Sequence, residues 1–496
     1  MKTPRTMRAQ PLRGATLAAV LALALSACAG APARLDPPVL RDEVPLAGLQ
    51  APARAEWPDP QWWRHYGDTQ LDALMTRALQ QSPDLAVAQS RVRDAEQSAQ
   101  LAAAQLGLSV NGSAQLARQR MSENGLIPAQ FLGFTWYNQA DLGVQLQYDF
   151  DWWGRKRATV EAALDQTRAA AAQQSAAVLA IEYAVADTYF SWQADQARLQ
   201  LADDLLATQQ QFTDIAELRV RQGVDLPDEA QKARAQLAAV HELRAALDGS
   251  AKIRQAALAS LLGIAPADLP ALQVRPLPAI DSGIPADASL DLIARRPDIA
   301  ASRWQVEAAV KNVDVARTAF FPDIGISAMA GLSSIDMGKL FTSGSRVFGL
   351  TPALHLPIFS GGRLQANYGV SQARLDAAVA QYDSTVQAAA REVATQALGA
   401  EQLAARRQAQ QGQLDADQKL LANARARARQ GVRDLRESLA AQAALLQQRD
   451  AAAQLQAQAL STDLALIKAL GGGYRHADDT SSPDNPSAGA ATDERH

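Results

Sequence analysis

The residue types that most often carry out chemistry in proteins are sparse in this chain. Its only cysteine is Cys28, so neither an internal disulfide nor a cysteine-based zinc cluster can form. The glycines of Gly361-Gly362-Arg363 lack the spacing of a phosphate-binding loop and fit a strand-to-helix turn better. The histidines are scattered and form no metal-binding pair: His65, His241, His355, His476 and His496. We therefore expect no enzyme, no metal site and no bound cofactor.

The N-terminus has the pattern of a secretory signal peptide. Basic residues in the first 14 positions precede an apolar run over residues 15–25, which is too short to span a bilayer. The next residues, Leu25-Ser26-Ala27-Cys28, resemble the lipobox of bacterial lipoproteins, in which the cysteine becomes the first mature residue and carries lipid, including palmitate. The residue after the cysteine is Ala29, which resembles the pattern of lipoproteins that are sorted to the outer membrane. We expect Cys28 to be lipidated; ordinary cleavage near Ala27 or Ala29 is the alternative.

The rest of the chain reads as long helices. Its 496 residues carry 48 basic and 52 acidic side chains with no lysine or arginine block, which argues against a nucleic-acid partner. Residues 155–222 contain neither proline nor glycine, and one helix of that length would extend on the order of 100 Å. Such a helix needs lateral partners because no single face buries enough surface. No later run of 18 apolar residues predicts a transmembrane helix.

An internal repeat organises the chain. Three motifs recur at an offset of 208 residues: Gly154-Arg155 and Gly362-Arg363, Arg221-Gln222-Gly223-Val224 and Arg429-Gln430-Gly431-Val432, and Leu262-Gly263 and Leu470-Gly471. Upstream, Pro83-Asp84 recurs as Pro297-Asp298 at an offset of 214. These matches predict a tandem duplication over residues 70–263 and 290–471. Each copy begins with one helix, at about 71–106 or 290–320, continues with two strands and ends in a helical hairpin.

Four segments alternate apolar with small or polar residues, at about 108–119, 138–150, 323–333 and 346–359. This alternation is typical of outer-membrane strands, which are apolar toward lipid and polar toward a water-filled lumen, although a soluble sandwich would show it too. Four strands cannot close a barrel, and an open edge is not tolerated in lipid. The barrel must therefore be shared, with 12 strands from three copies or 8 from two.

An ordered series of motifs covers about 410 residues of the chain. The motifs are Trp62-Trp63 before Tyr66-Gly67-Asp68, Ser82-Pro83-Asp84-Leu85, residues 148–155, residues 295–299, residues 320–324, residues 356–363, the two Arg-Gln-Gly-Val turns and residues 470–473. Together with the lipobox, the series resembles the outer membrane factor family of tripartite efflux systems. This is the TolC-like group, and the resemblance is to its OprM/NodT-like lipoprotein branch.

The resemblance implies a fold that combines transmembrane β with long α-helices. Family members are homotrimers with a 12-stranded barrel in the outer membrane and a 12-helix periplasmic α-barrel. They are passive exit ducts for drugs and other small organic or aromatic compounds. An inner-membrane transporter delivers the compounds through a periplasmic adaptor, or membrane fusion protein. The duct itself needs no cofactor besides the covalent lipid on Cys28, and the mature protein is expected in the Gram-negative outer membrane, extending into the periplasm.

The repeat and the resemblance together divide the chain into six parts. Residues 1–27 are the signal peptide, and residues 28–69 are a lipidated N-terminal segment that belongs to the equatorial region. The efflux repeats at 70–263 and 290–471 are joined by an equatorial connection at 264–289. Residues 472–496 are expected to form a flexible tail.

The functional end is expected at the hairpin tips, where Gly223-Val224 and Gly431-Val432 would contact the adaptor. By the resemblance, Glu437 falls where TolC-like ducts carry an aspartate, whereas Ala440 stands where OprM-like members carry another. Arg436 beside Glu437 therefore suggests an arginine–glutamate lock in place of two acidic rings. In a trimer, each acid near the tip would be repeated around the pore. The candidate gate residues are Asp228, Glu229, Arg433, Arg436 and Glu437.

Two further features have competing interpretations. Trp152 and Trp153 are interpreted as aromatic anchors at the membrane interface, with stacking on sugar or substrate as the alternative. A dense group of arginines near the second tip either contacts the adaptor or pump, or is simply solvated: Arg425, Arg427, Arg429, Arg433 and Arg436.

Two other functions remain open. One is a TolC-like duct for type I protein secretion. The predicted lipid anchor favours small-molecule efflux over this alternative. The other is a lipid-anchored periplasmic coiled-coil scaffold without a pore, against which the four amphipathic strands argue.

Overall fold

The computed structural model describes residues 32–44, 53–54, 56–122, 133–280, 283–285 and 288–475. The chain forms two units. The first comprises Met1–Val39, Arg93–Arg168 and Trp304–Ala380, and the second comprises Leu40–Val92, Ala169–Arg303 and Gln381–His496. Cys28, the lipidation candidate, lies outside the described residues. Among the helices in the described ranges, none is both long and apolar enough to cross a membrane.

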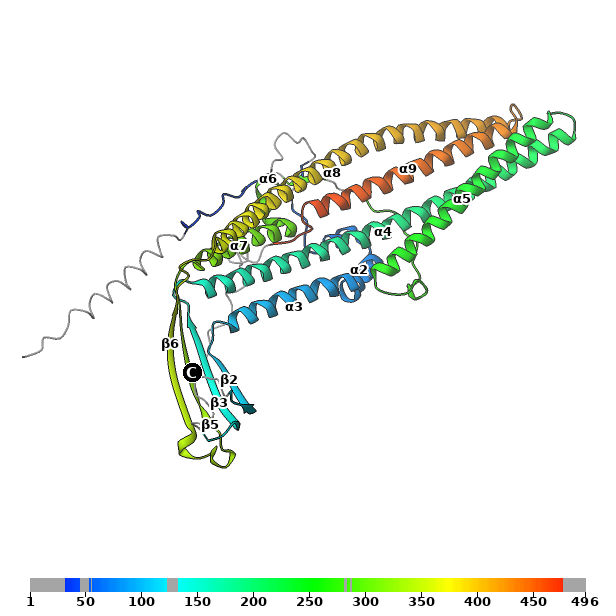
Figure 1. Cartoon of the computed structure of the whole chain (residues 1–496). Coiled ribbons are helices and arrows are strands. Elements are labelled where there is room, and N and C mark those ends of the chain that lie inside the picture. Colours follow the sequence, from blue (N-terminus) through cyan, green and yellow to red (C-terminus); the bar gives the residue numbers. More distant parts are fainter. Residues whose placement is uncertain are drawn as a thin grey trace, which may run out of the picture. The chain divides into compact units, whose positions relative to one another are not determined.

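A four-stranded antiparallel sheet is the central element of the first unit (Figure 1). Its strands are β2 (Ser109–Arg120), β3 (Trp136–Phe150), β5 (Asp323–Ser334) and β6 (Arg346–His355), in the order β2-β3-β5-β6. The two copies of the repeat therefore pair through β3 and β5. Strands β2 and β6 are the edges of this sheet, and each pairs on one side only within the described residues.

The register of the sheet places its apolar residues on one face. Val110 pairs with Leu146, Leu146 with Ala328, and Ala328 with Leu350. The neighbouring row on the opposite face is polar and consists of Ser109, Gln147, Ser327 and Thr351. The apolar face is exposed, with Leu350 at 69%. The predicted alternation is confirmed across all four strands.

Two strand boundaries differ from the prediction by more than one residue. Strand β6 ends at His355 rather than at 359. His355 pairs with Asp323, the first residue of β5, so the partner strand of β6 extends no further. Strand β3 begins at Trp136, two residues before the predicted start at 138, because Arg120 and Gln119 extend its partner strand to that level.

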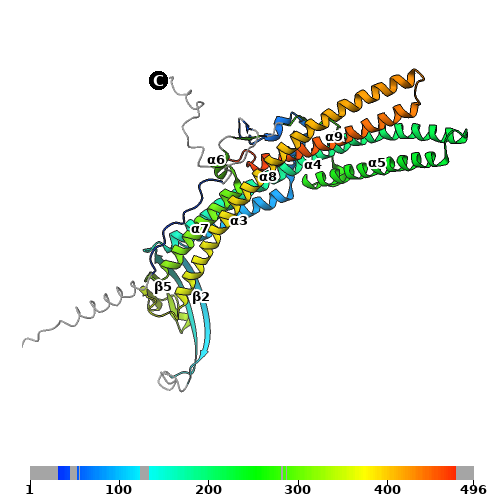
Figure 2. The same cartoon turned by 90° about the horizontal axis from the view of Figure 1, so that it is seen from above.

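Two long helical hairpins supply most of the second unit. They consist of α4 (Arg155–Arg221) with α5 (Pro227–Leu261), and α8 (Arg363–Arg429) with α9 (Leu435–Ala469). Both copies have the same lengths, 67 and 35 residues. Arg198 of α4 binds Asp450 of α9 through two hydrogen bonds of 2.7 and 3.1 Å, so the hairpins pack against each other. Figure 2 shows their turns at the same end of the unit.

The first helix of each copy is broken, and here the prediction of one continuous helix was wrong. The structure has α2 (Thr69–Gln81) and α3 (Pro83–Ala104) in the first copy, and α6 (Ala288–Arg295) and α7 (Pro297–Thr318) in the second. A proline starts the second helix of each pair. The residue before a proline is disfavoured in the α region, and proline itself is tolerated only in a first helical turn.

The segment that precedes the first copy of the repeat packs against the hairpins of the second unit. A 3-10 helix, η1 (Trp62–Tyr66), joins a core that includes Leu71, Tyr189 and Leu460. Two short strands, β1 (Ala53–Arg54) and β4 (Ile284–Pro285), pair in parallel. The other 3-10 turns are η3 (Pro266–Asp268), η4 (Met337–Lys339) and η5 (Ser343–Ser345).

The start of the predicted flexible tail is packed in this structure. Gly472 is buried, and Tyr474 packs against Ala172, Ala300 and Ala301. The expectation of a tail from 472 is therefore wrong for residues 472–475, because the apolar ring of Tyr474 buries surface on this alanine cluster.

Candidate functional site

The turns of the two hairpins have the same backbone geometry. Gly223 and Gly431 both adopt a φ of 70°, a left-handed conformation in which a side chain is strained. The N–H of Val224 donates to the carbonyl of Arg219 at 2.9 Å, and that of Val432 donates to the carbonyl of Arg427 at 3.0 Å. This is the Schellman ending of a helix, in which glycine is followed by an apolar residue. The Arg-Gln-Gly-Val repeat therefore encodes both turns.

Four charged residues join the two hairpins at their turns. Within the first hairpin, Arg219 donates two hydrogen bonds to Asp225, at 2.9 and 3.0 Å. Within the second, Arg436 donates to Asp434 at 2.9 Å. Between the hairpins, Arg436 Nη1 donates to Asp225 Oδ2 at 2.8 Å, and Arg219 Nη1 lies 3.5 Å from Asp434 Oδ2. We call this group of two arginines and two aspartates the ion-pair latch.

The latch keeps both aspartates ionised. The hydrogen bonds from Arg219, together with the positive charge of Arg436, hold the pKa of Asp225 below its usual range. The backbone N–H and the guanidinium of Arg436 do the same for Asp434. The side chain of Asp225 is 15% exposed and that of Arg436 is 22% exposed. Alternating charges in contact can therefore hold the two turns together at neutral pH.

The structure assigns different partners to the two central gate candidates. Arg436 binds Asp225 and Asp434, whereas Glu437 binds Arg427 at 2.6 Å and lies 3.8 Å from Arg433. Within one chain, then, the expected pairing of Arg436 with Glu437 is replaced by a contact between the hairpins. Whether these residues gate a pore stays a prediction.

The gate candidates of the first hairpin, Asp228 and Glu229, lie about one helical turn after Asp225 of the ion-pair latch. Glu229 forms an ion pair with Lys232 at 2.8 Å on exposed helix surface, and Asp228 precedes it in the first turn of α5. The valines that follow the turn glycines are exposed, at 57% for Val224 and 64% for Val432. The turns thus present an apolar surface next to charged side chains.

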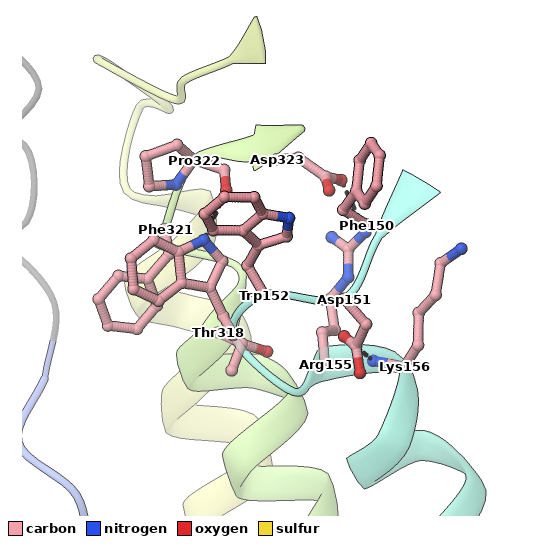
Figure 3. Close-up of a pocket in the computed structure, with 10 residues that line it drawn as sticks. Phe150, Asp151, Trp152, Arg155, Lys156, Thr318, Phe321, Pro322 and Asp323 are labelled. Carbon is pink, nitrogen blue, oxygen red and sulfur yellow. Dashed lines mark hydrogen bonds and ion pairs between the residues drawn. The ribbon is translucent and has the colours of Figure 1, made fainter. Parts of the chain in front are cut away.

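The junction between β3 and α4 is a second candidate site, a small surface pocket shown in Figure 3. Asp151 accepts hydrogen bonds from the N–H groups of Lys156 and Arg157 and so caps α4. Burial works to raise the pKa of Asp151, but these hydrogen bonds outweigh it and lower the pKa. Arg155 binds Asp323 at the start of β5 at 2.7 Å. These contacts fix the turn from strand to helix.

The two tryptophans of this junction are held differently. Trp153 stacks on Phe321 with ring centroids 4.8 Å apart and donates from Nε1 to the carbonyl of Pro322 at 2.8 Å. Trp152 is 66% exposed and touches Phe150 edge to face. Exposed indoles at the end of strands with an apolar face are typical of a membrane interface. That role remains the prediction for both.

A buried polar network in the second unit was missed by the sequence reasoning. Trp62 Nε1 donates to Glu182 Oε2 at 3.2 Å, and Tyr66 donates to Asp463 at 2.7 Å. Burial, only partly offset by the Trp62 hydrogen bond, raises the pKa of Glu182 to about 7. Tyr189 donates to Asp68, the N-cap of α2, at 2.7 Å.

This network accounts for Trp62, Tyr66 and Asp68 of the motif. Its polar atoms fasten the N-terminal segment to α4 and α9, which come from different copies of the repeat. The signal available in the sequence was an acid, Glu182, within an otherwise apolar stretch of α4.

An open-edged sheet with one apolar face, together with two long helical hairpins per chain, is the architecture of outer-membrane efflux channels. The model of the outer membrane efflux protein family matches residues 74–264 and 289–472. The chain belongs to this family, and it is an outer-membrane protein. The named relatives and neighbours are efflux proteins and channels rather than enzymes.

Individual relatives are similar over most of the chain. The multidrug resistance outer membrane protein MdtP of Escherichia coli (strain K12) is 33% identical over 441 residues, covering 88% of this chain and 90% of MdtP. MdtQ of Escherichia coli O157:H7 is 32% identical, covering 92% of this chain and 97% of MdtQ. The crystal structure of the outer membrane protein VceC from Vibrio cholerae matches with a TM-score of 0.76 at 32% identity, covering 84% of this chain and all of VceC.

Proposed function

We propose that three copies of this chain form one continuous duct through the outer membrane and into the periplasm. The observation that carries the proposal is the sheet, which has one exposed apolar face and two edge strands, β2 and β6. Unpaired edges are costly in lipid, so β2 of one copy must pair with β6 of the next. Three copies close a barrel of 12 strands, and the hairpins of the same copies supply 12 helices.

The duct conducts passively and opens at the hairpin turns. The ion-pair latch holds the two turns of each copy together, and opening separates Arg436 from Asp225 and Arg219 from Asp434. Arg219–Asp225 and Arg436–Asp434 stay intact because each lies within one hairpin. Separation therefore exposes two neutral pairs rather than four isolated charges, which keeps the two states close in free energy.

The cargo is small organic molecules such as drugs and aromatic compounds. Support comes from the relatives MdtP and MdtQ, which are named for multidrug resistance. An inner-membrane transporter supplies the energy, and a periplasmic adaptor binds the exposed turns at Val224 and Val432. Lipid on Cys28 anchors the N-terminus in the outer membrane. No cofactor takes part.

The test of the duct is assembly and conductance. Native mass measurement of the detergent-solubilised protein should give a trimer, and planar bilayers should show discrete channels. Arg436→Ala should raise single-channel conductance and sensitise the host to vancomycin, because the contact between hairpins is lost. Lys252→Ala is the matched control, since it removes an exposed ion pair with Asp248 on α5, away from the turns. A folded monomer, a stable dimer or equal conductance of both variants contradicts the proposal.

The lipid anchor has its own test. Cys28→Ser should abolish metabolic labelling with palmitate while barrel insertion continues, because insertion depends on the strands. Unchanged labelling of the variant contradicts lipidation at Cys28.

A further inference from the structure

The two hairpin turns share a backbone but differ in charge. The repeat offset of 208 residues pairs Glu217 with Arg425, Asp225 with Arg433 and Asp228 with Arg436. Three acids of the first turn region are thus replaced by arginines in the second. Residues 217–236 carry four basic and four acidic side chains and are neutral, whereas residues 425–444 carry five arginines and two acids, a net charge of +3.

The contacts reflect this difference. In the first hairpin, Glu217 accepts from Arg234 at 2.8 Å, an ion pair that joins α4 to α5. At the equivalent place in the second hairpin, Arg425 donates to the neutral amide of Gln442 at 2.8 Å. Glu437 is shared by two arginines there. The positive charge of the second turn is therefore not balanced within it.

An apolar centre lies among these arginines. Val432 and Leu435 are 64% and 54% exposed, and the side chain of Arg433 is 66% exposed. Protein interfaces have an apolar core, are enriched in arginine and select their partners by charge complementarity, and this turn has all the elements for such a contact. A site for a small anion would instead gather its donors around one concave point.

We propose that the turn of the second hairpin, residues 425–437, docks an acidic protein surface, while the turn of the first hairpin docks a neutral one. This inference rests on the proposed function, because the partner is the helical end of the periplasmic adaptor. In a trimer, three turns of charge +3 alternate with three neutral turns around the opening. An adaptor ring with acidic side chains around an apolar patch can then seat in only one of the two alternating registers.

The test uses the full-length protein in lipid nanodiscs and two synthetic helical hairpin peptides. The peptides have equal length and apolar content, and one carries glutamates and the other lysines around its turn. Surface plasmon resonance should show the acidic peptide binding about tenfold more tightly than the basic one, with an affinity that falls as salt rises. Arg425→Glu, which installs the first-hairpin charge, should weaken the acidic peptide about tenfold. Arg406→Glu on exposed α8 surface outside the turn is the matched control and should change affinity less than twofold.

Three outcomes would overturn the inference. Equal binding of both peptides, or equal effects of Arg425→Glu and Arg406→Glu, would show that charge at this turn does not select the partner. Displacement of the acidic peptide by benzoate but not by chloride at the same ionic strength would make the turn a site for small anions. Channel conductance of the same preparations distinguishes failure of this inference from failure of the proposed function. A conducting trimer without charge preference refutes this inference alone.

Discussion

Glu182 should make the stability of the protein depend on pH near neutrality. Its side chain is buried on α4, with the residue only 6% exposed, and accepts one hydrogen bond from Trp62. A buried carboxylate with a single neutral donor is poorly solvated, so the protonated form is favoured and the pKa rises from 4.5 to about 7. Replacing Glu182 with Gln keeps an oxygen that accepts from Trp62 and removes the ionisation.

The size and sign of the effect follow from proton linkage. Between pH 4.5 and about 7 the unfolded chain has lost this proton and the folded chain still holds it, so folding stability falls as pH rises. The full shift corresponds to about 3 kcal/mol, lost through this window and constant above it. Glu182→Gln should therefore match wild type near pH 4.5 and exceed its stability at pH 8 by up to about 3 kcal/mol.

Thermal unfolding of the detergent-solubilised protein at several pH values measures this difference. The melting temperature of wild type should fall between pH 5 and pH 8 by more than that of Glu182→Gln. Glu242→Gln, at an exposed position of α5, is the control and should follow wild type. Parallel curves for wild type and Glu182→Gln would refute the claim that Glu182 is protonated in the folded protein.

Three further predictions concern the turns and the sheet junction. Gly431→Ala should cost about 1 kcal/mol because of its φ of 70°, whereas Gly412→Ala in the interior of α8 should gain about 0.5–1 kcal/mol; melting temperatures that shift in the same direction would contradict this. Glu437→Gln should lower cation selectivity in reversal-potential measurements, because it leaves Arg427 and Arg433 without their shared acid; an unchanged reversal potential places Glu437 away from the ion path. Trp153→Phe keeps the stacking on Phe321 but loses the hydrogen bond to Pro322, so it should lower stability by about 1 kcal/mol; a variant as stable as wild type would show that this bond contributes nothing.

The sequence predicted the features that depend on local pattern. The period-2 alternation around Val144 and Leu350 places the apolar residues on one face, and the register confirms it. The absence of proline and glycine from 155 to 222 predicts α4, and the glycines at 223 and 431 predict the turns. The break before Pro83 was available from the same sequence and was overlooked, because the apolar periodicity continues across it.

The features that depend on contacts between distant residues could not be predicted. Arg436 and Asp225 are 211 residues apart and belong to different copies of the repeat, so nothing near Arg436 indicates its partner. Glu437 adjoins Arg436 in sequence, but consecutive residues of a helix do not face each other, and the structure gives them different partners. Likewise, the pKa of Glu182 is raised by the burial that the assembled core creates, and Trp62, which only partly offsets this effect, is 120 residues away.

In the proposed opening of the duct, the composition of the ion-pair latch bears on how readily the two turns come together again. A latch made of one positive and one negative half would leave an isolated charge on each side when it opened. Counterions would bind to these charges and slow reclosure. Each half of the latch carries its own arginine and its own aspartate, Arg219 with Asp225 and Arg436 with Asp434, so each half remains a neutral ion pair when the halves separate. In the proposed duct, such a contact can be released and remade many times without recruiting counterions to the latch.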